Sequence, residues 1–314
     1  MSRRTKGYLP CLLCGRERRP VLTGLYDHRF GAPGAYDIVR CQVCGLEQTW
    51  PRPAEAELKE LYERYYNYGG EEGTAYTAMR ERFMASGLYR LWLRADGDVA
   101  FHLRPGAGRL LDVGCNEGRG LACYAANGFA AEGLELNERA AAVARARGFT
   151  VHISPLAQFD PRKPYEVVVL ANVLEHAWDP RAMLKDVRRV LKPGGQVWIS
   201  CPNAASFWRI LFKQHWINWH VPFHLWHFSP RTLEEVLARA NLRLVEMSTC
   251  TPSLWLAQSL LVKLASQAGR ANRVMRAAPV VTSLTLAARG FLHPWLGRLD
   301  RQMQGDCLIA TARG

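Results

Sequence analysis

The sequence contains no long apolar stretch. No uncharged apolar run approaches the roughly 18 to 20 residues that cross a bilayer. The first residues, MSRRTKGYLPCLLC, are basic but do not include the apolar core that a signal peptide needs. Repeats and low-complexity tracts are also absent, and 314 residues suffice for one large domain or for a core with appendages. We therefore expect a globular protein of the cytoplasm.

Acidic residues are scarce relative to basic ones. The chain has 41 Lys and Arg against 28 Asp and Glu, a formal net charge of +13. A basic surface favours anionic partners such as nucleic acid, phosphorylated sugars or membrane headgroups. The basic residues are dispersed and form no basic-aromatic stripe for stacking bases, which argues against nucleic acid. Nine cysteines in a reducing compartment indicate thiols or metal ligands rather than disulfides.

Four of the cysteines form two C-x-x-C-G motifs separated by 26 residues: Cys11, Cys14, Cys41 and Cys44. Four thiolates in two such pairs match the tetrahedral ligand set of a zinc ion. The glycine after each pair permits the tight turn that points backbone N–H groups at the sulfurs. Because cysteine fills all four positions, the zinc would be structural. The sequence therefore predicts a zinc ribbon over residues 1–53.

A helical linker is predicted over residues 54–104. A helix begins near Ala54, and an aromatic stretch with Tyr62, Tyr65, Tyr66 and Tyr68 follows. These aromatics either pack the ribbon against the main domain or form a lid over an active site, and the sequence leaves both readings open.

From Arg109 onward, strands alternate with amphipathic helices, which favours a parallel sheet covered on both faces. The segment RLLDVGCNEGRG reads as a strand, a glycine turn and a helix. Gly114 and Gly118 allow a ligand to approach the backbone, and Asp112 supplies a carboxylate beside it. Glu135 ends the second strand, where an acid can accept hydrogen bonds from the two hydroxyls of a ribose.

Five segments in order carry a family resemblance: LDVGCNEG, GLELN, YEVVVLANVLEHAWDP, RRVLKPGGQVWISCPN and HLWHFSPRTLEEVLARANL. The chain resembles class I S-adenosylmethionine (SAM)-dependent methyltransferases of the type that includes ubiquinone-biosynthesis O-methyltransferases. The resemblance implies an α/β, Rossmann-like, mostly parallel sheet of seven strands, formed by residues 105–250 and 305–314. Asn116 stands where the family usually has glycine, and asparagine tolerates a left-handed backbone.

The resemblance also implies how SAM is bound. Asp112, Gly114, Cys115, Asn116 and Gly118 would shape the pocket for its methionine part, and Glu135 would hold the ribose. Leu136 would also contact the cofactor. Leu156 and Ala157 would flank the adenine, and Asn172 would lie beneath the sulfonium. Cys115 can also be read as a small buried residue, which we favour over a redox role.

The segment NVLEHAWDP follows the apolar strand Val167–Leu170 and carries Glu175 and His176. Open parallel sheets bind ligands at the carboxyl ends of their strands. A hydroxyl acceptor must lose a proton on methylation, so we predict His176 as the base and Glu175 as the residue that orients it or contacts substrate. Alternatively, Glu175 caps the following helix, or the pair binds a metal.

The segment QHWINWHVPFHLWHFS holds four of the nine histidines: His215, His220, His224 and His227. We expect it to line the substrate pocket, with His224 as the residue most directly involved. Some relatives that the chain resembles hold Mg²⁺ with an E-x-x-E-H motif and a later histidine. Here Asn172 replaces the first glutamate, which counts against that site.

Residues 251–304 separate the two last strands of the sheet and carry seven basic residues and one acid. Their apolar runs place tryptophans beside arginines, as in helices that lie on an anionic membrane. The protein is then expected at the inner face of the membrane. The alternative is a helical insertion that packs on its own core or on a second copy of the chain.

The expected function is SAM-dependent methylation of an oxygen on a sugar, glycan precursor or lipid-linked intermediate. A four-cysteine ribbon ahead of this core is similar to enzymes that modify sugars and cell-surface polysaccharides, some of which methylate carbon. Two other readings are an RNA methyltransferase whose ribbon reads RNA, and a module that binds the cofactor without catalysis.

Overall fold

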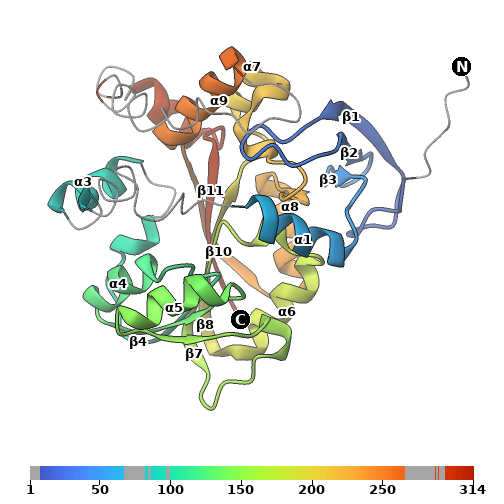
Figure 1. The fold of residues 1–314 in the computed structure, drawn as a ribbon. Helices are drawn as coiled ribbons and strands as arrows, with labels where there is room; N and C mark the ends of the chain where they lie inside the picture. The colour runs from blue at the N-terminus through green and yellow to red at the C-terminus, as the bar shows by residue number, and fades with distance from the viewer. Residues whose placement is uncertain are drawn as a thin grey trace, which may run out of the picture.

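The computed structural model describes residues 8–66, 82–83, 86–96, 100–265, 287, 289 and 294–314. Within these ranges the chain forms a seven-stranded sheet flanked by helices and a separate four-stranded sheet near the amino terminus (Figure 1). The predicted tyrosine Tyr68 and the basic residues Arg270, Arg273 and Arg276 of the insertion lie outside the described residues.

The large sheet has the strand order β10-β11-β8-β7-β4-β5-β6. Strands β4 to β8 pair in parallel, whereas β11 runs antiparallel to both of its neighbours. This confirms the predicted Rossmann-like, mostly parallel seven-stranded sheet. The strands are β4 (Gly108–Val113), β5 (Phe129–Leu134), β6 (Thr150–His152), β7 (Tyr165–Ala171), β8 (Leu191–Pro202), β10 (Arg243–Cys250) and β11 (Cys307–Arg313).

Helices cover both faces of this sheet because its strands are apolar on both sides. One face packs against α4 (Arg119–Ala126), the short η1 (Ala100–Leu103) and α9 (Ser253–Ala265). The other packs against α6 (Pro180–Val190) and α8 (Pro230–Arg239). The helix α5 (Glu138–Ala146) joins β5 to β6.

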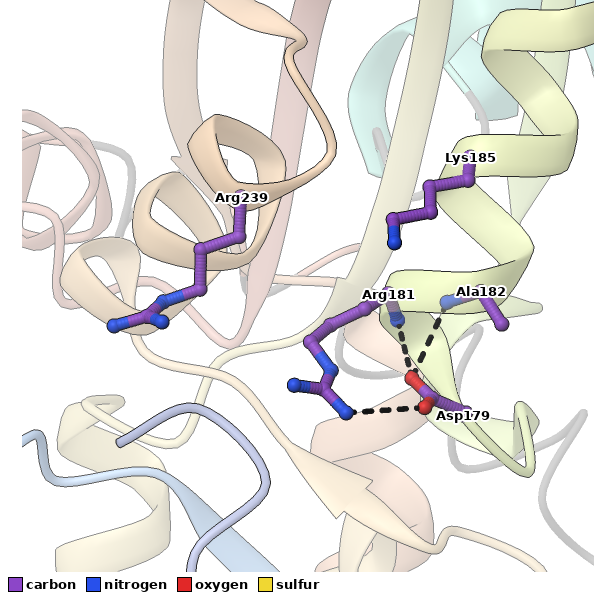
Figure 2. Close-up of a pocket in the computed structure, with 5 residues that line it drawn as sticks. All are labelled: Asp179, Arg181, Ala182, Lys185 and Arg239. Atoms are coloured by element: carbon purple, nitrogen blue, oxygen red, sulfur yellow. Dashed lines mark hydrogen bonds and ion pairs between the residues drawn. The ribbon is translucent and has the colours of Figure 1, made fainter. Parts of the chain in front are cut away.

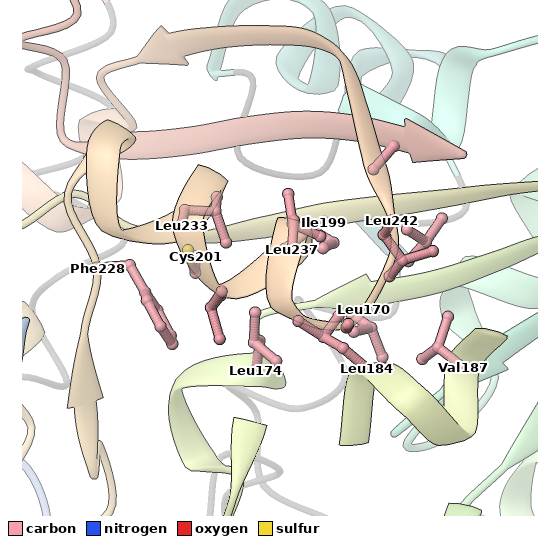
Figure 3. Packing of buried hydrophobic residues seen from close by; sticks show 14 of the residues in the cluster. Leu170, Leu174, Leu184, Val187, Ile199, Cys201, Phe228, Leu233, Leu237 and Leu242 are labelled. Atoms are coloured by element: carbon pink, nitrogen blue, oxygen red, sulfur yellow. The ribbon is translucent and has the colours of Figure 1, made fainter. Parts of the chain in front are cut away.

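The core between the sheet and helices α6 and α8 is built from leucine and valine (Figure 3). Leu170 and Ile199 project from β7 and β8 toward Leu184 of α6 and Leu237 of α8, and all four are fully buried. Each such side chain contributes about 1.5–3 kcal/mol by leaving water. This packing fixes the strand β7 whose carboxyl end carries Glu175 and His176.

Helix starts in this core are set by local polar residues. Asp179 caps α6 by accepting from the N–H groups of Arg181 and Ala182, and Pro180 occupies the first turn. Ser229 caps α8 in the same way by accepting from the N–H of Thr232. The reading in which Glu175 caps α6 is therefore wrong, because Asp179 already fills that position.

The small sheet has the order β1-β2-β3-β9. Its first three strands come from the cysteine-rich segment, but β9 comes from the histidine-rich segment of the main domain. Glu47 pairs with His227, and Gln48 pairs with Trp226. The sheet of the amino-terminal module thus extends beyond residue 53 to include a piece of the core. The strands are β1 (Arg18–Leu25), β2 (Tyr36–Cys41), β3 (Glu47–Trp50) and β9 (Trp226–His227).

The linker contributes α1 (Glu55–Tyr65), which begins where the sequence predicted a helix, and α3 (Gly87–Asp96). The described part of the insertion is helical: α9 continues from β10, and residues 294–301 form a further helical stretch. Short elements connect β8 to β9, namely α7 (Phe207–Phe212), η4 (Lys213–His215) and η5 (Ile217–Trp219). None of the described helices is both long and apolar enough to cross a membrane.

Candidate active site

The predicted cofactor residues lie at one edge of the large sheet. Asp112 lies near the carboxyl end of β4, and the others follow the end of a parallel strand: Gly114 to Gly118 follow β4, Glu135 and Leu136 follow β5, and Asn172 follows β7. Leu156 and Ala157 lie in η2 (Leu156–Gln158), just after β6. The carboxyl edge of an open α/β sheet is where ligands of this fold class bind.

The glycine turn after β4 adopts a backbone that few residues tolerate. Gly114 has φ +72° and Gly118 has φ +77°. A Cβ on Gly118 would lie 2.8 Å from the Cβ of Ala144, so helix α5 closes on this turn only because it is glycine. Asn116 has φ +49°, which confirms the predicted left-handed conformation at the family's usual glycine position. The backbone of this turn thus adopts the conformation that leaves it facing the carboxyl edge of the sheet.

The carboxylate of Glu135 fixes this turn to the end of β5. Its Oε2 accepts from the N–H of Asn116 at 2.8 Å, and its Oε1 accepts from the N–H groups of Leu136 and Asn137, both at 2.8 Å. The side chain remains partly exposed. A carboxylate has about four lone-pair sites and three are occupied here, so Glu135 can still accept a hydrogen bond from one hydroxyl of a ribose.

Asp112 and Cys115 lie deeper. Burial, followed by repulsion from the Glu135 carboxylate, raises the pKa of Asp112 to about 7. Cys115 packs among Leu121, Ala141 and other apolar side chains, and burial raises the pKa of its thiol. The structure therefore favours the reading of Cys115 as a small buried residue that shapes the turn from behind.

Apolar surface is exposed where the adenine is expected. Leu136 is 67% exposed, although large aliphatic side chains are normally buried. Ile153 is also exposed at the end of β6, and the sequence analysis missed it. Leu156 is buried and Ala157 is exposed. Leu136 follows β5 and Ile153 follows the adjacent strand β6, and two exposed apolar side chains placed in this way suit a flat aromatic ligand. The contact of these residues with a cofactor stays a prediction.

Asn172 has a left-handed backbone, φ +55°, and its Oδ1 is buried with no hydrogen-bond partner among the described residues. An orphaned buried amide oxygen costs about 1–3 kcal/mol, which a bound ligand can recover. This group, the remaining lone-pair site of Glu135 and the exposed Leu136 all fit the binding of SAM.

Glu175, His176 and His224 converge beside this edge. Glu175 and His176 lie in η3 (Leu174–His176), directly after β7. One ligand atom from each of the three lies within 4.8 Å of the others. Nε2 of His224 is 4.0 Å from Oε1 of Glu175. The structure thus brings together the three predicted catalytic residues, although His176 and His224 are 48 positions apart in the sequence.

Backbone carbonyls determine which nitrogen carries the hydrogen in both imidazoles. Nδ1 of His224 lies 2.8 Å from the carbonyl of Asn218, and Nδ1 of His176 lies 3.0 Å from the carbonyl of Phe223. A carbonyl oxygen only accepts, so each Nδ1 carries the hydrogen and each Nε2 is left as an acceptor. His176 keeps part of its surface exposed.

Burial sets the charge of this cluster. Burial lowers the pKa of His176 to about 4 and that of His224 well below its usual value. Burial raises the pKa of Glu175 to about 8, and neither carboxyl oxygen has a partner among the described residues. Near neutral pH both imidazoles are therefore neutral bases, and the carboxyl is protonated.

Tyr62 of α1 is a site residue whose role the sequence did not resolve. Its hydroxyl lies 2.6 Å from Nδ1 of His176, and its ring packs edge-on against Phe223 at 5.1 Å. Tyr66 stacks on His220 with 5.7 Å between ring centroids. Tyr66 also packs against Phe30 of the amino-terminal module at 5.4 Å between ring centroids, so these tyrosines both cover the histidine cluster and join the module to the core.

The histidine-rich segment is mostly interior. His220, His224 and His227 are buried, whereas His215 is partly exposed. Thr49 of β3 donates to the carbonyl of His224 at 2.6 Å, and its Oγ1 lies 3.1 Å from Nε2 of His227. The amino-terminal module therefore holds the backbone of the segment that presents His224.

The four motif cysteines converge as predicted. Sγ of Cys11 lies 3.4 Å from that of Cys44, and Sγ of Cys14 lies 3.3 Å from that of Cys41. All four sulfurs lie within 4.8 Å of one another. Gly15 and Gly45 have φ +70° and +82°, the tight turn expected after each pair.

A hollow of about 360 Å³ lies between α6 and α8, on the outside of the sheet (Figure 2). None of the predicted cofactor or catalytic residues lines it. Arg181 is already paired with Asp179 at 3.3 Å, and Arg239 with Glu235 at 2.8 Å. The hollow is thus separate from the site at the carboxyl edge of the sheet.

The sheet order, the glycine turn and the acid at the end of β5 define a SAM-dependent methyltransferase domain. The family model of the methyltransferase domain matches residues 76–247, more than half of the chain. The chain belongs to this methyltransferase family.

Similar proteins carry the same description. The chain is 35% identical to a probable SAM-dependent methyltransferase of Mycolicibacterium smegmatis, over 43% of this chain and 52% of that protein. It is 31% identical to the ubiquinone biosynthesis O-methyltransferase of Idiomarina loihiensis, over 35% and 50%. The chain thus spans about half the length of these curated relatives. A SAM-dependent methyltransferase from Archaeoglobus fulgidus is 19% identical over 77% of this chain and all of that one, with a TM-score of 0.46.

Proposed function

We propose that this protein methylates a hydroxyl oxygen of a sugar, of a glycan precursor or of a lipid-linked sugar. The observation that carries the proposal is the neutral His176 at the carboxyl end of β7, held by Tyr62 and the carbonyl of Phe223. An acceptor hydroxyl must lose its proton during methylation, so a base has to lie beside it. The net charge of +13 suits an acceptor that carries phosphate.

Bound SAM supplies an electrophilic methyl group on a sulfonium. Gly114, Asn116, Glu135 and Asn172 would hold the cofactor at the sheet edge. His176 then accepts the acceptor's proton at Nε2, because Nδ1 is occupied by the carbonyl of Phe223. Alignment of the methyl donor with the acceptor supplies most of the remaining rate acceleration, since methyl transfer is an in-line displacement.

The carboxyl of Glu175 acts beside this base. Protonated near neutral pH, it can donate a hydrogen bond to Nε2 of His224 or to the acceptor. The same three groups could instead hold a divalent cation. Asn172 stands where the Mg²⁺-binding E-x-x-E-H motif has its first glutamate, so we favour acid–base chemistry. Metal analysis of a variant lacking Cys11 and Cys14 decides between the readings, because any remaining stoichiometric metal would belong to the Glu175 cluster.

We further propose a structural zinc ion at Cys11, Cys14, Cys41 and Cys44. A tetrahedral ion about 2.3 Å from each sulfur needs sulfurs about 3.8 Å apart, close to the 3.3 and 3.4 Å found here. Support also comes from the N–H of Val43, which points at Sγ of Cys41 at 3.4 Å. One equivalent of zinc in the purified protein, lost in Cys44→Ser, is the expected result.

The decisive experiment uses SAM with a labelled methyl group and fractionated cell extract. Label in the soluble-sugar or lipid fraction is expected, and NMR of the product then separates an O-methyl from a C-methyl group. A general base is worth about 10² to 10⁴ in rate, and the lowered pKa of His176 places it at the lower end of that range. His176→Ala should therefore bind SAM normally in calorimetry and lose about 100-fold in turnover.

The matched control is His215→Ala, which changes a partly exposed histidine of the same segment. Normal turnover in His176→Ala would remove the base from the proposal. Label in RNA would replace the acceptor class with nucleic acid. Absence of SAM binding by the wild-type protein would overturn the assignment of the cofactor residues.

A further inference from the structure

Two neighbouring helices outside the sheet expose large apolar side chains. Ile210 and Leu211 of α7 and Leu260 and Leu264 of α9 are 41–74% exposed. Trp295 is also exposed, at 41%. Large exposed aliphatic and aromatic side chains grouped on one region mark an interaction surface. We call this group of five residues the α7–α9 face.

The members of the α7–α9 face lie at one end of the molecule. Helices α7 and α9 contact each other and lie side by side in Figure 1. Leu260 and Leu264 are four residues apart, so they project from the same side of α9. The ring of Trp295 packs against Phe207 of α7 at 5.3 Å between centroids. The face is thus a single region contributed by three segments.

Exposed basic side chains lie in the same segments that form this face. Lys213 follows α7, and Lys263 lies between the exposed leucines of α9; both are exposed. Arg298 and Arg301 are exposed in the helical stretch that carries Trp295. Within residues 207–215, 253–265 and 294–301 the one acid is Asp300, whose carboxylate accepts from the hydroxyl of Thr251 at 3.3 Å. The face therefore carries apolar and cationic side chains with one internally bonded acid.

We propose that the α7–α9 face docks on the surface of an anionic phospholipid bilayer. The apolar side chains enter the boundary between headgroups and acyl chains, and the four cations contact anionic headgroups. Charge argues against a second copy of the chain as the occupant. A twofold interface would bring these same cations together, and the described segments of the face offer no acid besides Asp300 to compensate them. The proposal does not depend on which acceptor is methylated.

The test measures vesicle binding of the full chain without substrate. Vesicles of phosphatidylglycerol and phosphatidylcholine should sediment the protein, whereas phosphatidylcholine alone should sediment much less. Each basic residue near an anionic surface is worth about fivefold in affinity. Lys213→Gln with Lys263→Gln should therefore weaken binding about 25-fold, and Ile210→Ser with Leu264→Ser by at least about tenfold.

Val245→Ser is the matched control, since Val245 is 46% exposed on β10, outside the face. It should bind vesicles like the wild type. Equal binding by the serine double variant and the wild type would overturn the proposal, as would equal binding to both vesicle types. A dimer in light scattering that dissociates in Leu264→Ser, with no vesicle binding, would assign the face to a second copy instead. Thermal unfolding of each variant checks that its fold is unchanged.

Discussion

The hydroxyl of Tyr62 lies 2.6 Å from Nδ1 of His176, although the two residues belong to different parts of the chain. Tyr62 comes from α1, ahead of the matched methyltransferase segment, and His176 follows strand β7 within it. The contact, together with the carbonyl of Phe223, holds the imidazole with Nε2 available. The linker helix therefore forms part of the wall of the candidate site.

Tyr62→Phe removes this contact while keeping the ring that packs on Phe223. We expect turnover to fall about tenfold with little change in SAM affinity, because the imidazole loses one of the groups that orient it. Steady-state kinetics with calorimetry measures both quantities. Tyr65→Phe changes a neighbouring tyrosine of α1 and should be neutral. Equal activity of the two variants would contradict a positioning role for Tyr62.

Thr49→Val tests the link between the amino-terminal module and the site. Valine keeps the shape of threonine but leaves the carbonyl of His224 and Nε2 of His227 without their partner, inside a buried region. We expect a loss of about 1–3 kcal/mol in the free energy of unfolding, together with reduced turnover. Chemical denaturation and kinetics check this. The exposed Thr23 of β1 provides the control, Thr23→Val, which should behave like the wild type.

Gly118→Ala tests the cofactor turn. A left-handed backbone costs a non-glycine residue about 1–2 kcal/mol, and here the added Cβ would also press on Ala144 at 2.8 Å. We expect lower stability and weaker SAM binding. Gly148→Ala separates the two causes, because Gly148 has φ +89° but no atom within 4 Å of an added Cβ. If both variants bind SAM equally well, close packing at Gly118 has no role in the cofactor site.

His102 gives the protein a defined acid sensitivity. Burial lowers its pKa to about 4, whereas the unfolded chain has a pKa near 6.5. Between these values the unfolded state binds more protons, so the stability that this residue contributes is complete above pH 6.5 and is lost as the pH falls to 4. His102→Phe removes the titration and keeps a ring against Tyr124.

The stability of His102→Phe relative to wild type should therefore rise by up to about 1.4 kcal/mol for each pH unit below 6.5. Denaturant unfolding from pH 4 to pH 9 measures the difference, which should be constant above pH 7. A difference independent of pH below 6.5 would show that His102 is not held neutral by burial.

Much of the fold could be predicted because the sequence patterns that indicate it involve only neighbouring residues. The step from apolar run to glycine turn to helix at Leu110–Gly118 needs only neighbouring residues, and Asn116 adopts the left-handed backbone that its side chain tolerates. The two C-x-x-C-G motifs likewise form their turns within five residues each. Asp179, not Glu175, caps α6, and here the local rule was sound but applied to the wrong acid.

The sequence by itself therefore determined the sheet, the glycine turn, the cysteine cluster and the likeness to methyltransferases. Only the tertiary structure decided that β3 pairs with β9, that Tyr62 reaches His176 and that Thr49 holds the backbone of His224. These contacts join residues that lie 114 to 180 positions apart in the sequence. Which residues meet in these contacts depends on the strand edges and helix faces that remain uncovered once the core has packed. No local sequence pattern predicts these contacts, because they depend on the order of all the strands at once.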